Sequence, residues 1–170
     1  MRYSSYIVCA ALVLLASCTP KHARMTTTDK DGSKIIVGTS SRAALADPAY
    51  SWFKTGYDAY KPAVAPVNII KAQAPALHIE VFGGTWCEDT HNLLPKFYKV
   101  ADAAQLKDSQ ITLHLVNRDK KTQDGSADKY KIVNVPTYII LKGEKEIGRI
   151  VESAKTSVEA DFAEILTDKD

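Results

Sequence analysis

The sequence has few cysteines, no excess of charge of one sign, and a single long apolar run. Three cysteines among 170 residues are too few for a scaffold stabilised by disulfide bonds. The 22 basic and 20 acidic residues nearly cancel, so the composition indicates neither a nucleic-acid-binding surface nor an acidic tail. The hydrophobic fraction of 45% and the charged fraction of 25% argue against disorder and against a multi-span membrane protein. The length suits one globular domain.

The apolar run, Ile7–Ala16, follows Arg2 and is too short to cross a bilayer as a permanent helix. This layout predicts a signal peptide over residues 1–17. The run ends in Leu-Ala-Ser-Cys at Cys18, which resembles the bacterial lipoprotein signal, in which that cysteine receives a diacylglycerol group. The alternative is an ordinary signal peptide that is cut nearby and leaves Cys18 as a thiol. The lipoprotein hypothesis places the chain in the cell envelope, extracytoplasmic and anchored to a membrane by lipid, facing the periplasm in a Gram-negative cell.

The next part of the chain divides into a tether and an N-terminal extension. Residues 18–32 are polar and rich in turn formers, which predicts a flexible lipidated tether. Residues 33–75 form the extension, where a helix is expected to begin at Asp47-Pro48 because Asp is a good N-cap and Pro suits the first turn. Its aromatic side chains are expected to pack on the main domain rather than to form a partner surface. They are Tyr50, Trp52, Phe53, Tyr57 and Tyr60.

Hydrophobic periodicity predicts an α/β domain over residues 76–170, with a mixed sheet and helices on both faces. A helix beginning near Cys87 has apolar residues at spacings of four, three and four from Leu93 to Ala104, which predicts one buried face, and Pro95 is expected to kink it. The predicted strands are Ser33–Gly38, Leu77–Phe82, Ile111–Val116, Thr137–Leu141 and Glu146–Val151. The other predicted helices are Val67–Gln73, after breaks at Pro62 and Pro66, Ser126–Ile132 and Thr156–Leu166.

Two short motifs make this order of elements specific. Trp86-Cys87 follows a strand and opens a helix, and Val135-Pro136-Thr137 immediately precedes another strand. Together they resemble the thioredoxin family, in which Trp-Cys-x-x-Cys begins a long, proline-kinked helix and a cis-proline loop packs against the reactive sulfur. The resemblance covers residues 76–168 and implies a thioredoxin fold.

The motifs also indicate a chemical site at Cys87. A sulfur in the first helical turn faces unpaired N–H groups and the positive end of the helix dipole, and both favour the thiolate. The resemblance implies that Trp86 shields one side of this sulfur and that the loop at Pro136 holds a substrate segment against it. The candidate substrate contacts are Val135, Thr137, Glu88, Asp89 and His91.

Two departures from the family pattern remove the same half-reaction, the step that uses the second thiol. The second family cysteine is replaced by Thr90, and the usual buried carboxylate, which assists the second thiol, is replaced by Val81. Thr90 either donates a hydrogen bond to the Cys87 sulfur or merely caps the helix. Glu80 is adjacent to Val81, but on a strand it points to the opposite face and does not supply the missing base.

Three ionisable residues follow Cys87. Glu88 and Asp89 disfavour the thiolate by like-charge repulsion, although acidic residues in a first helical turn have an equally good structural explanation. His91 lies four residues after Cys87, on the same helix face. Protonated, His91 would favour the thiolate; the alternative is a solvated surface residue.

The sequence therefore supports two hypotheses. In the first, Cys87 exchanges with protein disulfides or small thiols, and an external thiol reductant resolves the mixed disulfide. The mature chain then has one thiol, since Cys9 leaves with the signal peptide and Cys18 carries lipid. In the second, the fold is a redox-silent module that binds peptides or proteins. Neither hypothesis needs a cofactor, and a closed zinc site is not expected because His78 and His114 lie on separate strands from Cys87.

Overall fold

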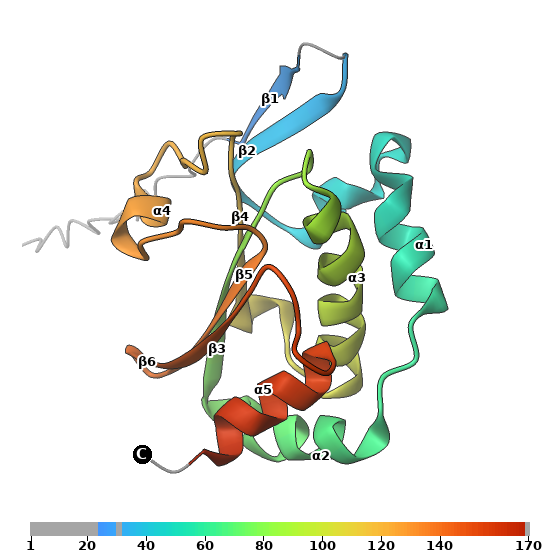
Figure 1. Ribbon diagram of the computed structural model, residues 1–170, viewed down its shortest axis with the longest axis vertical. Helices are drawn as coiled ribbons and strands as arrows, with labels where there is room; N and C mark the ends of the chain where they lie inside the picture. The colour runs from blue at the N-terminus through green and yellow to red at the C-terminus, as the bar shows by residue number, and fades with distance from the viewer. Residues whose placement is uncertain (1–23, 30–31, 169–170) are drawn as a thin grey trace, which may run out of the picture.

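The centre of the structure is a six-stranded mixed sheet, with strand order β1-β2-β4-β3-β5-β6 (Figure 1). The computed structural model describes residues 24–29 and 32–168. The strands are β1 Met25–Thr28, β2 Lys34–Ser40, β3 Leu77–Gly83, β4 Ile111–Leu115, β5 Thr137–Lys142 and β6 Lys145–Val151. The helices are α1 Ser51–Ala59, α2 Val64–Gln73, α3 Glu88–Ala103, α4 Ser126–Lys129 and α5 Val158–Thr167, with short 3-10 turns η1 Arg42–Ala46, η2 Pro48–Tyr50, η3 Ala74–Ala76 and η4 Asp108–Gln110. The predicted α/β fold class is confirmed.

The central strands pair as the thioredoxin-like order predicts. β3 runs parallel to β4 and antiparallel to β5, and β5 and β6 form an antiparallel hairpin. The connection from β3 to β4 passes through α3, the crossover that parallel neighbours require. Alternate residues of β3 face opposite sides of the sheet, so that Val81 lies in the larger hydrophobic core and Phe82 in the smaller one.

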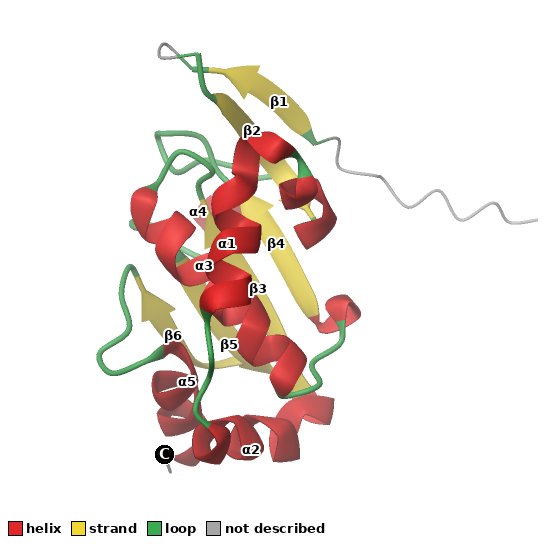
Figure 2. Ribbon diagram, turned by 90° about the vertical axis from the view of Figure 1, so that its right-hand side faces the viewer, coloured by secondary structure: helices red, strands yellow, loops and turns green. Residues whose placement is uncertain are grey.

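Helices cover both faces of the sheet, but unequally. Helices α1, α2, α3 and α5 lie on one side, and the short α4 lies on the other (Figures 1 and 2). The larger core therefore fills the space under four helices and includes Phe97 of α3 and Phe162 of α5. The smaller core includes Ala127 of α4. The Cys87 turn follows β3, and Trp86 and Cys87 pack against the smaller core.

Predictions for the N-terminal part need two corrections. Residues 18–32 were expected to be an irregular tether, but Met25–Thr28 forms β1 and pairs antiparallel with β2, because its threonines are β-branched and suit a strand. Pro66 was expected to break a helix, but it lies in the first turn of α2, where proline removes no helical hydrogen bond. The predicted signal peptide and Cys18 lie outside the described residues. None of the helices in the described residues is long and apolar enough to cross a bilayer.

The aromatic helix of the extension packs on α3, as predicted. Tyr50 is buried, and the remaining aromatic side chains of this segment pack against the larger core. α1 approaches α3 closely because Gly56 has no side chain: a Cβ atom there would lie 2.7 Å from Cγ of Pro95. The side chain of Asp47 accepts a hydrogen bond from the Ala49 N–H at 2.9 Å, which confirms the predicted cap at this position, although it caps the 3-10 turn that leads into α1.

A buried carboxylate connects the end of α1 to α5. Glu159 is 3% exposed and accepts hydrogen bonds from the Tyr60 hydroxyl at 2.6 Å and from the Ala63 N–H at 2.9 Å. Burial alone would raise the pKa of Glu159, but these hydrogen bonds outweigh burial and lower the pKa. Glu159 therefore fixes the connection between α1 and α2 as an ionised group.

Candidate functional site

The structure brings the two predicted motifs together at Cys87. This residue ends the turn after β3 and is the N-cap of α3, and its N–H donates to the Gly84 carbonyl at 2.9 Å. Its thiol is free and half-buried, and it donates a hydrogen bond to the Val135 carbonyl at 3.4 Å. The Val135–Pro136 peptide bond is cis, as predicted. The sulfur therefore lies between the start of a helix and the cis-proline loop.

The loop after β4 fixes the indole of Trp86, the residue before Cys87. The indole Nε1–H donates to the Val116 carbonyl at 3.0 Å, and the Arg118 guanidinium lies 5.3 Å from the ring centre. Arg118 also forms an ion pair with Asp29, in the turn between β1 and β2. A Cβ atom at Gly84 would lie 2.7 Å from the indole, so the close approach of the ring requires glycine there. The Trp86 indole is thus held by the loop after β4 and, through Arg118, by the turn between β1 and β2.

Thr90 does not have either of the roles considered from the sequence. Its side chain is fully buried, and its hydroxyl accepts a hydrogen bond from the Gly84 N–H at 3.1 Å. The cap position of α3 belongs to Cys87, and the described residues contain no hydrogen bond between Thr90 and the Cys87 sulfur. Thr90 instead accepts a hydrogen bond from a buried backbone N–H of the turn that carries Cys87. Without this bond, the buried N–H would have no partner and would destabilise the fold.

His91 also differs from both expectations. Its Nε2 lies 2.8 Å from the Thr85 carbonyl oxygen, and its ring stacks on Trp52 with a centroid distance of 4.3 Å and an interplanar angle of 20°. It is therefore neither a solvated surface residue nor a direct partner of the Cys87 sulfur. The spacing of four residues from Cys87 indicated that His91 lies near the site. The contact between His91 and Trp52 could not be predicted, because the two residues are far apart in sequence.

The other candidate substrate contacts separate into two groups. Glu88 and Asp89 are exposed in the first turn of α3, next to Cys87 and accessible to a bound molecule. Thr137 is 2% exposed, and its hydroxyl donates to the Asn134 carbonyl at 2.7 Å. The Thr137 hydroxyl thus fixes the cis-proline loop from inside, and the assignment of Thr137 as a substrate contact stays a prediction.

The position of the missing carboxylate is filled by hydrophobic packing. Val81 is fully buried and pairs across the sheet with Tyr138 of β5. The Tyr138 hydroxyl is buried without a hydrogen-bond partner in the described residues, and burial raises its pKa well above the ordinary value. At these two paired positions of the interior, the structure thus has a valine and a neutral phenol in place of the carboxylate that could accept a proton from a second thiol.

A polar cluster on the opposite face of the sheet was not predicted. Glu80 points away from the larger core, as expected, and its carboxylate lies 2.7 Å from His114 Nε2 and 3.3 Å from His78 Nε2. The Tyr130 hydroxyl also donates to Glu80, at 3.2 Å, and His114 Nδ1 lies 3.1 Å from the Ser126 hydroxyl. Burial would raise the pKa of Glu80, but the interactions with His114 and its neighbours lower it. Within the described residues, no group of three or more His, Cys, Asp and Glu side chains is arranged to hold a metal ion.

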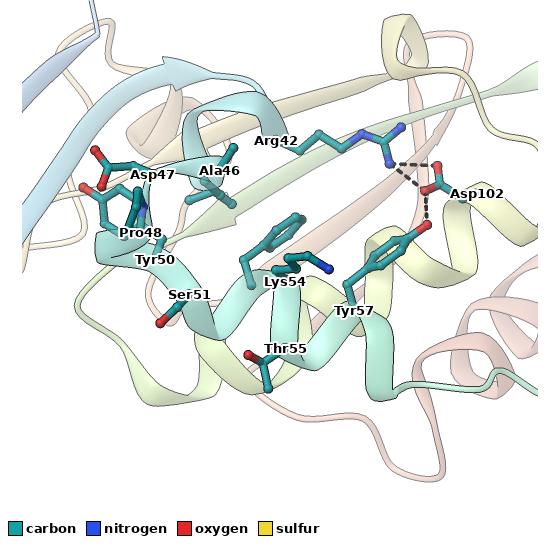
Figure 3. A pocket seen from close by; sticks show the side chains of 12 residues that line it. Arg42, Ala46, Asp47, Pro48, Tyr50, Ser51, Lys54, Thr55, Tyr57 and Asp102 are labelled. Atoms are coloured by element: carbon teal, nitrogen blue, oxygen red, sulfur yellow. Dashed lines mark hydrogen bonds and ion pairs between the residues drawn. The ribbon is translucent and has the colours of Figure 1, made fainter.

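A cleft of about 570 Å³ lies between η1, η2 and the beginning of α1 (Figure 3). Leu45, Tyr50 and Phe53 give it apolar walls. At one end, the Arg42 guanidinium and the Tyr57 hydroxyl both donate to the Asp102 carboxylate, at 2.7 and 2.6 Å. These bonds attach α1 to the far end of α3. The cleft is separate from the Cys87 turn, none of whose residues lines it.

Comparison with known proteins gives the family of the chain. The model of the thioredoxin family matches residues 67–164, more than half of the chain, whereas a comparison with curated proteins found no significant match. Among solved structures, a protein of unknown function from Pseudomonas aeruginosa is 16% identical, with 74% of this chain and 78% of that chain covered and a TM-score of 0.45. A thioredoxin from Fasciola hepatica is 23% identical, with 59% and 86% covered and a TM-score of 0.39. Because the family model spans β3, the helix that follows Cys87 and the cis-proline strand, the chain belongs to the thioredoxin family.

Proposed function

We propose that the protein carries out thiol–disulfide exchange through the single thiol of Cys87. The observation that carries this proposal is the position of the thiol, at the N-cap of α3 and 3.4 Å from the carbonyl that precedes the cis-proline. The unpaired N–H groups of the first helical turn stabilise a thiolate at this place. A disulfide bound along the cis-proline loop would present one sulfur to Cys87.

The reaction then proceeds in three balanced exchanges. The Cys87 thiolate attacks one sulfur of the substrate disulfide, the Cys87–substrate bond forms, and the other substrate sulfur leaves as a thiolate that takes a proton from solvent. An external thiolate next attacks the Cys87 sulfur, forms a disulfide with it, and releases the substrate thiol. A second external thiolate attacks the external sulfur of this disulfide, forms an external disulfide, and releases the Cys87 thiolate. The position of an internal resolving thiol belongs to Thr90, and a base for such a thiol is missing at Val81.

We also propose that the protein is a lipoprotein of the cell envelope that faces the extracytoplasmic side. The signal-like residues 1–17 and the Leu-Ala-Ser-Cys sequence at Cys18 support this proposal. The test is detergent phase partitioning of the wild type and of Cys18→Ala, expressed with the complete leader. We expect the wild type in the detergent phase and the variant in the aqueous phase. Equal aqueous partitioning of both processed proteins would overturn the proposal.

A redox-silent binding module is the second candidate, and one observation favours it. The Cys87 sulfur donates to the Val135 carbonyl, a hydrogen bond that only the protonated thiol can make. In this case the groove would bind peptides without forming a covalent bond to them.

A trapping experiment separates the two candidates. The protein is mixed at neutral pH with a peptide that contains one disulfide, and products are followed by intact-mass spectrometry, with Cys87→Ser as the control. We expect a covalent adduct of Cys87 with one half of the peptide, and its removal when a small thiol is added. Binding of the peptide without an adduct, equally in wild type and Cys87→Ser, would support the binding module instead.

A further inference from the structure

We propose that Trp52 and His91 are positioning residues for Cys87, and that they act by holding Thr85 in the turn before α3. This inference deepens the proposed exchange reaction and rests on it. It assigns a role in the site to the N-terminal extension, because Trp52 lies on α1, while His91 lies on α3. Neither side chain contacts the sulfur, so each acts through the turn.

Thr85 is held from both of its polar groups. Its hydroxyl accepts a hydrogen bond from the Ile36 N–H of β2 at 3.2 Å. Its carbonyl lies 2.8 Å from Nε2 of His91, and since a carbonyl can only accept, this ring nitrogen carries a proton. Thr85 is 6% exposed, so loss of either partner leaves a buried polar atom unsatisfied. The backbone two residues before Cys87 is thus fixed by β2 and by α3.

Trp52 fixes the ring that makes the second of these bonds. Its indole stacks on His91 at 4.3 Å and makes an edge contact with Phe53 at 6.0 Å. The ring of His91 is therefore covered by a flat aromatic surface and cannot rotate away from Thr85 without breaking the stack. Because Trp52 is only partly buried, its position depends on how firmly α1 is attached.

α1 is attached to α3 at two further points. Gly56 contacts Pro95, with no room for a side chain between them. The Tyr57 hydroxyl donates to Asp102 at 2.6 Å, beside the Arg42 guanidinium (Figure 3). Along both helices, these two contacts come after the contact between Trp52 and His91. The packing of α1 against α3 therefore holds the Trp52 indole in place.

The consequence for Cys87 follows from the geometry of the turn. The Cys87 N–H donates to the Gly84 carbonyl at 2.9 Å, closing the turn around Thr85. A fixed Thr85 therefore determines where the sulfur lies relative to the Val135 carbonyl. A substrate that must lie along the cis-proline loop needs this alignment, since a displacement of about 1 Å can lower a rate by roughly a hundredfold. A small reagent that reacts with any accessible thiolate does not need this alignment.

The experiment compares two reactions of Cys87 in the same variants. The second-order rate constant is measured with an extended disulfide peptide and with a small aromatic disulfide, and their ratio is the readout. We expect Trp52→Ala and His91→Ala to lower the ratio about tenfold, and Trp52→Phe, which keeps an aromatic stack, to restore most of it. Lys54→Ala is the matched control, because Lys54 is an exposed residue of α1 that pairs with Asp58 on the same helix, and its ratio should equal that of the wild type.

Hydrogen exchange provides a readout that does not depend on chemistry. Loss of the His91 contact should increase exchange of the Ile36 and Cys87 amides about fivefold or more, while the amide of Ile140 in the central strand β5 stays protected. If Trp52→Ala does not fold, His91→Phe keeps the stack and removes only the bond to Thr85. Folded variants with an unchanged rate ratio and unchanged amide exchange would overturn the inference. A wild type that reacts with no disulfide would overturn the exchange function, whereas the amide exchange would still decide the positioning role.

Discussion

Replacing Thr90 by cysteine tests how much of a two-cysteine reaction the site retains. The substitution places a second sulfur one helical turn after Cys87, at the spacing that the thioredoxin resemblance implies for a redox pair. In the proposed reaction, the wild-type protein needs an external thiol to resolve its mixed disulfide, so its turnover depends on the thiol concentration. An internal thiol acts at an effective concentration of about 10 mM or more. At 1 mM external thiol, we therefore expect Thr90→Cys to turn over about tenfold faster than the wild type.

The structure also predicts two unfavourable effects of this substitution, one on stability and one on the reactivity of the new thiol. The Thr90 hydroxyl accepts from the buried Gly84 N–H at 3.1 Å, and sulfur is a weak acceptor, so the reduced variant should lose about 1–2 kcal/mol of unfolding free energy. Thr90→Ser keeps the acceptor and should lose less. The new thiol would also be buried, with Val81 in place of the family carboxylate, which slows its deprotonation. The gain in turnover should consequently be partial.

The assay is reduction of a protein disulfide substrate in a reductant too weak to act alone. Wild type, Thr90→Cys, Thr90→Ser and Cys87→Ser are compared at equal concentration, and the internal disulfide of Thr90→Cys is verified by mass. Thr90→Ser should behave as the wild type, which separates the new thiol from the disturbed turn. If Thr90→Cys forms its disulfide and remains as inactive as Cys87→Ser, the groove does not present substrate disulfides to this sulfur, and the binding module becomes the better proposal.

Three further predictions concern the elements that support the site. Glu159→Gln should be less stable than the wild type above pH 4.5, and the difference should shrink as the pH falls below that value, since the pKa of Glu159 is lowered in the folded state; urea unfolding across pH 3–7 measures this. Gly56→Ala gains about 1 kcal/mol of helix propensity, but its Cβ would meet the rigid Pro95 ring at 2.7 Å, so we expect a net loss of about 1 kcal/mol in urea unfolding. Asp102→Asn removes the anionic acceptor of Arg42 and Tyr57 at a half-exposed position, and its thermal midpoint should reflect a loss of about 1 kcal/mol.

The parts of the fold that could be predicted from the sequence are those encoded by local patterns. The strand Leu77–Gly83 has apolar residues that alternate with His78 and Glu80 before it ends at a pair of glycines, and α3 has a four-three-four apolar spacing. The Ser157 side chain accepts from the Ala160 N–H at 3.2 Å, as expected of a helix cap. In each case a few neighbouring residues determine the backbone, so the sequence alone was sufficient.

The parts that could not be predicted depend on contacts between distant segments. The strand Met25–Thr28 is stable because it pairs with β2, and a polar segment of four residues gives no periodic signal of its own. The helix expected over 126–132 ends at Lys129, and the chain then takes a positive φ of 55° at Lys131, an uncommon conformation for lysine. Neither feature has a local pattern from which it could be inferred.

The same distinction applies to the arrangement of the candidate site residues. Cys87, Trp86 and Pro136 belong to short motifs, and the structure brings them together as expected. The roles of Thr90 and His91 depend on which polar atom lies opposite each side chain, and these atoms belong to Gly84 and Thr85, inside the turn itself. Their spacing from Cys87 suggested sulfur chemistry, but their hydrogen bonds stabilise the backbone that carries the sulfur.

This arrangement separates the nucleophilic half of the site from the resolving half. At the two positions where the chain departs from the family pattern, the side chains are buried and have structural roles. Thr90 accepts a hydrogen bond from the Gly84 N–H, and Val81 packs opposite Tyr138. Restoring a resolving thiol at Thr90 therefore disturbs the turn, and restoring a carboxylate at Val81 would place an unpaired charge in the core. The hydrogen bonds of the cis-proline loop, from the Thr137 hydroxyl to the Asn134 carbonyl and from the Cys87 thiol to the Val135 carbonyl, involve neither residue. In the proposed reaction, Cys87 forms a mixed disulfide at this site, and a thiol from the surroundings resolves it.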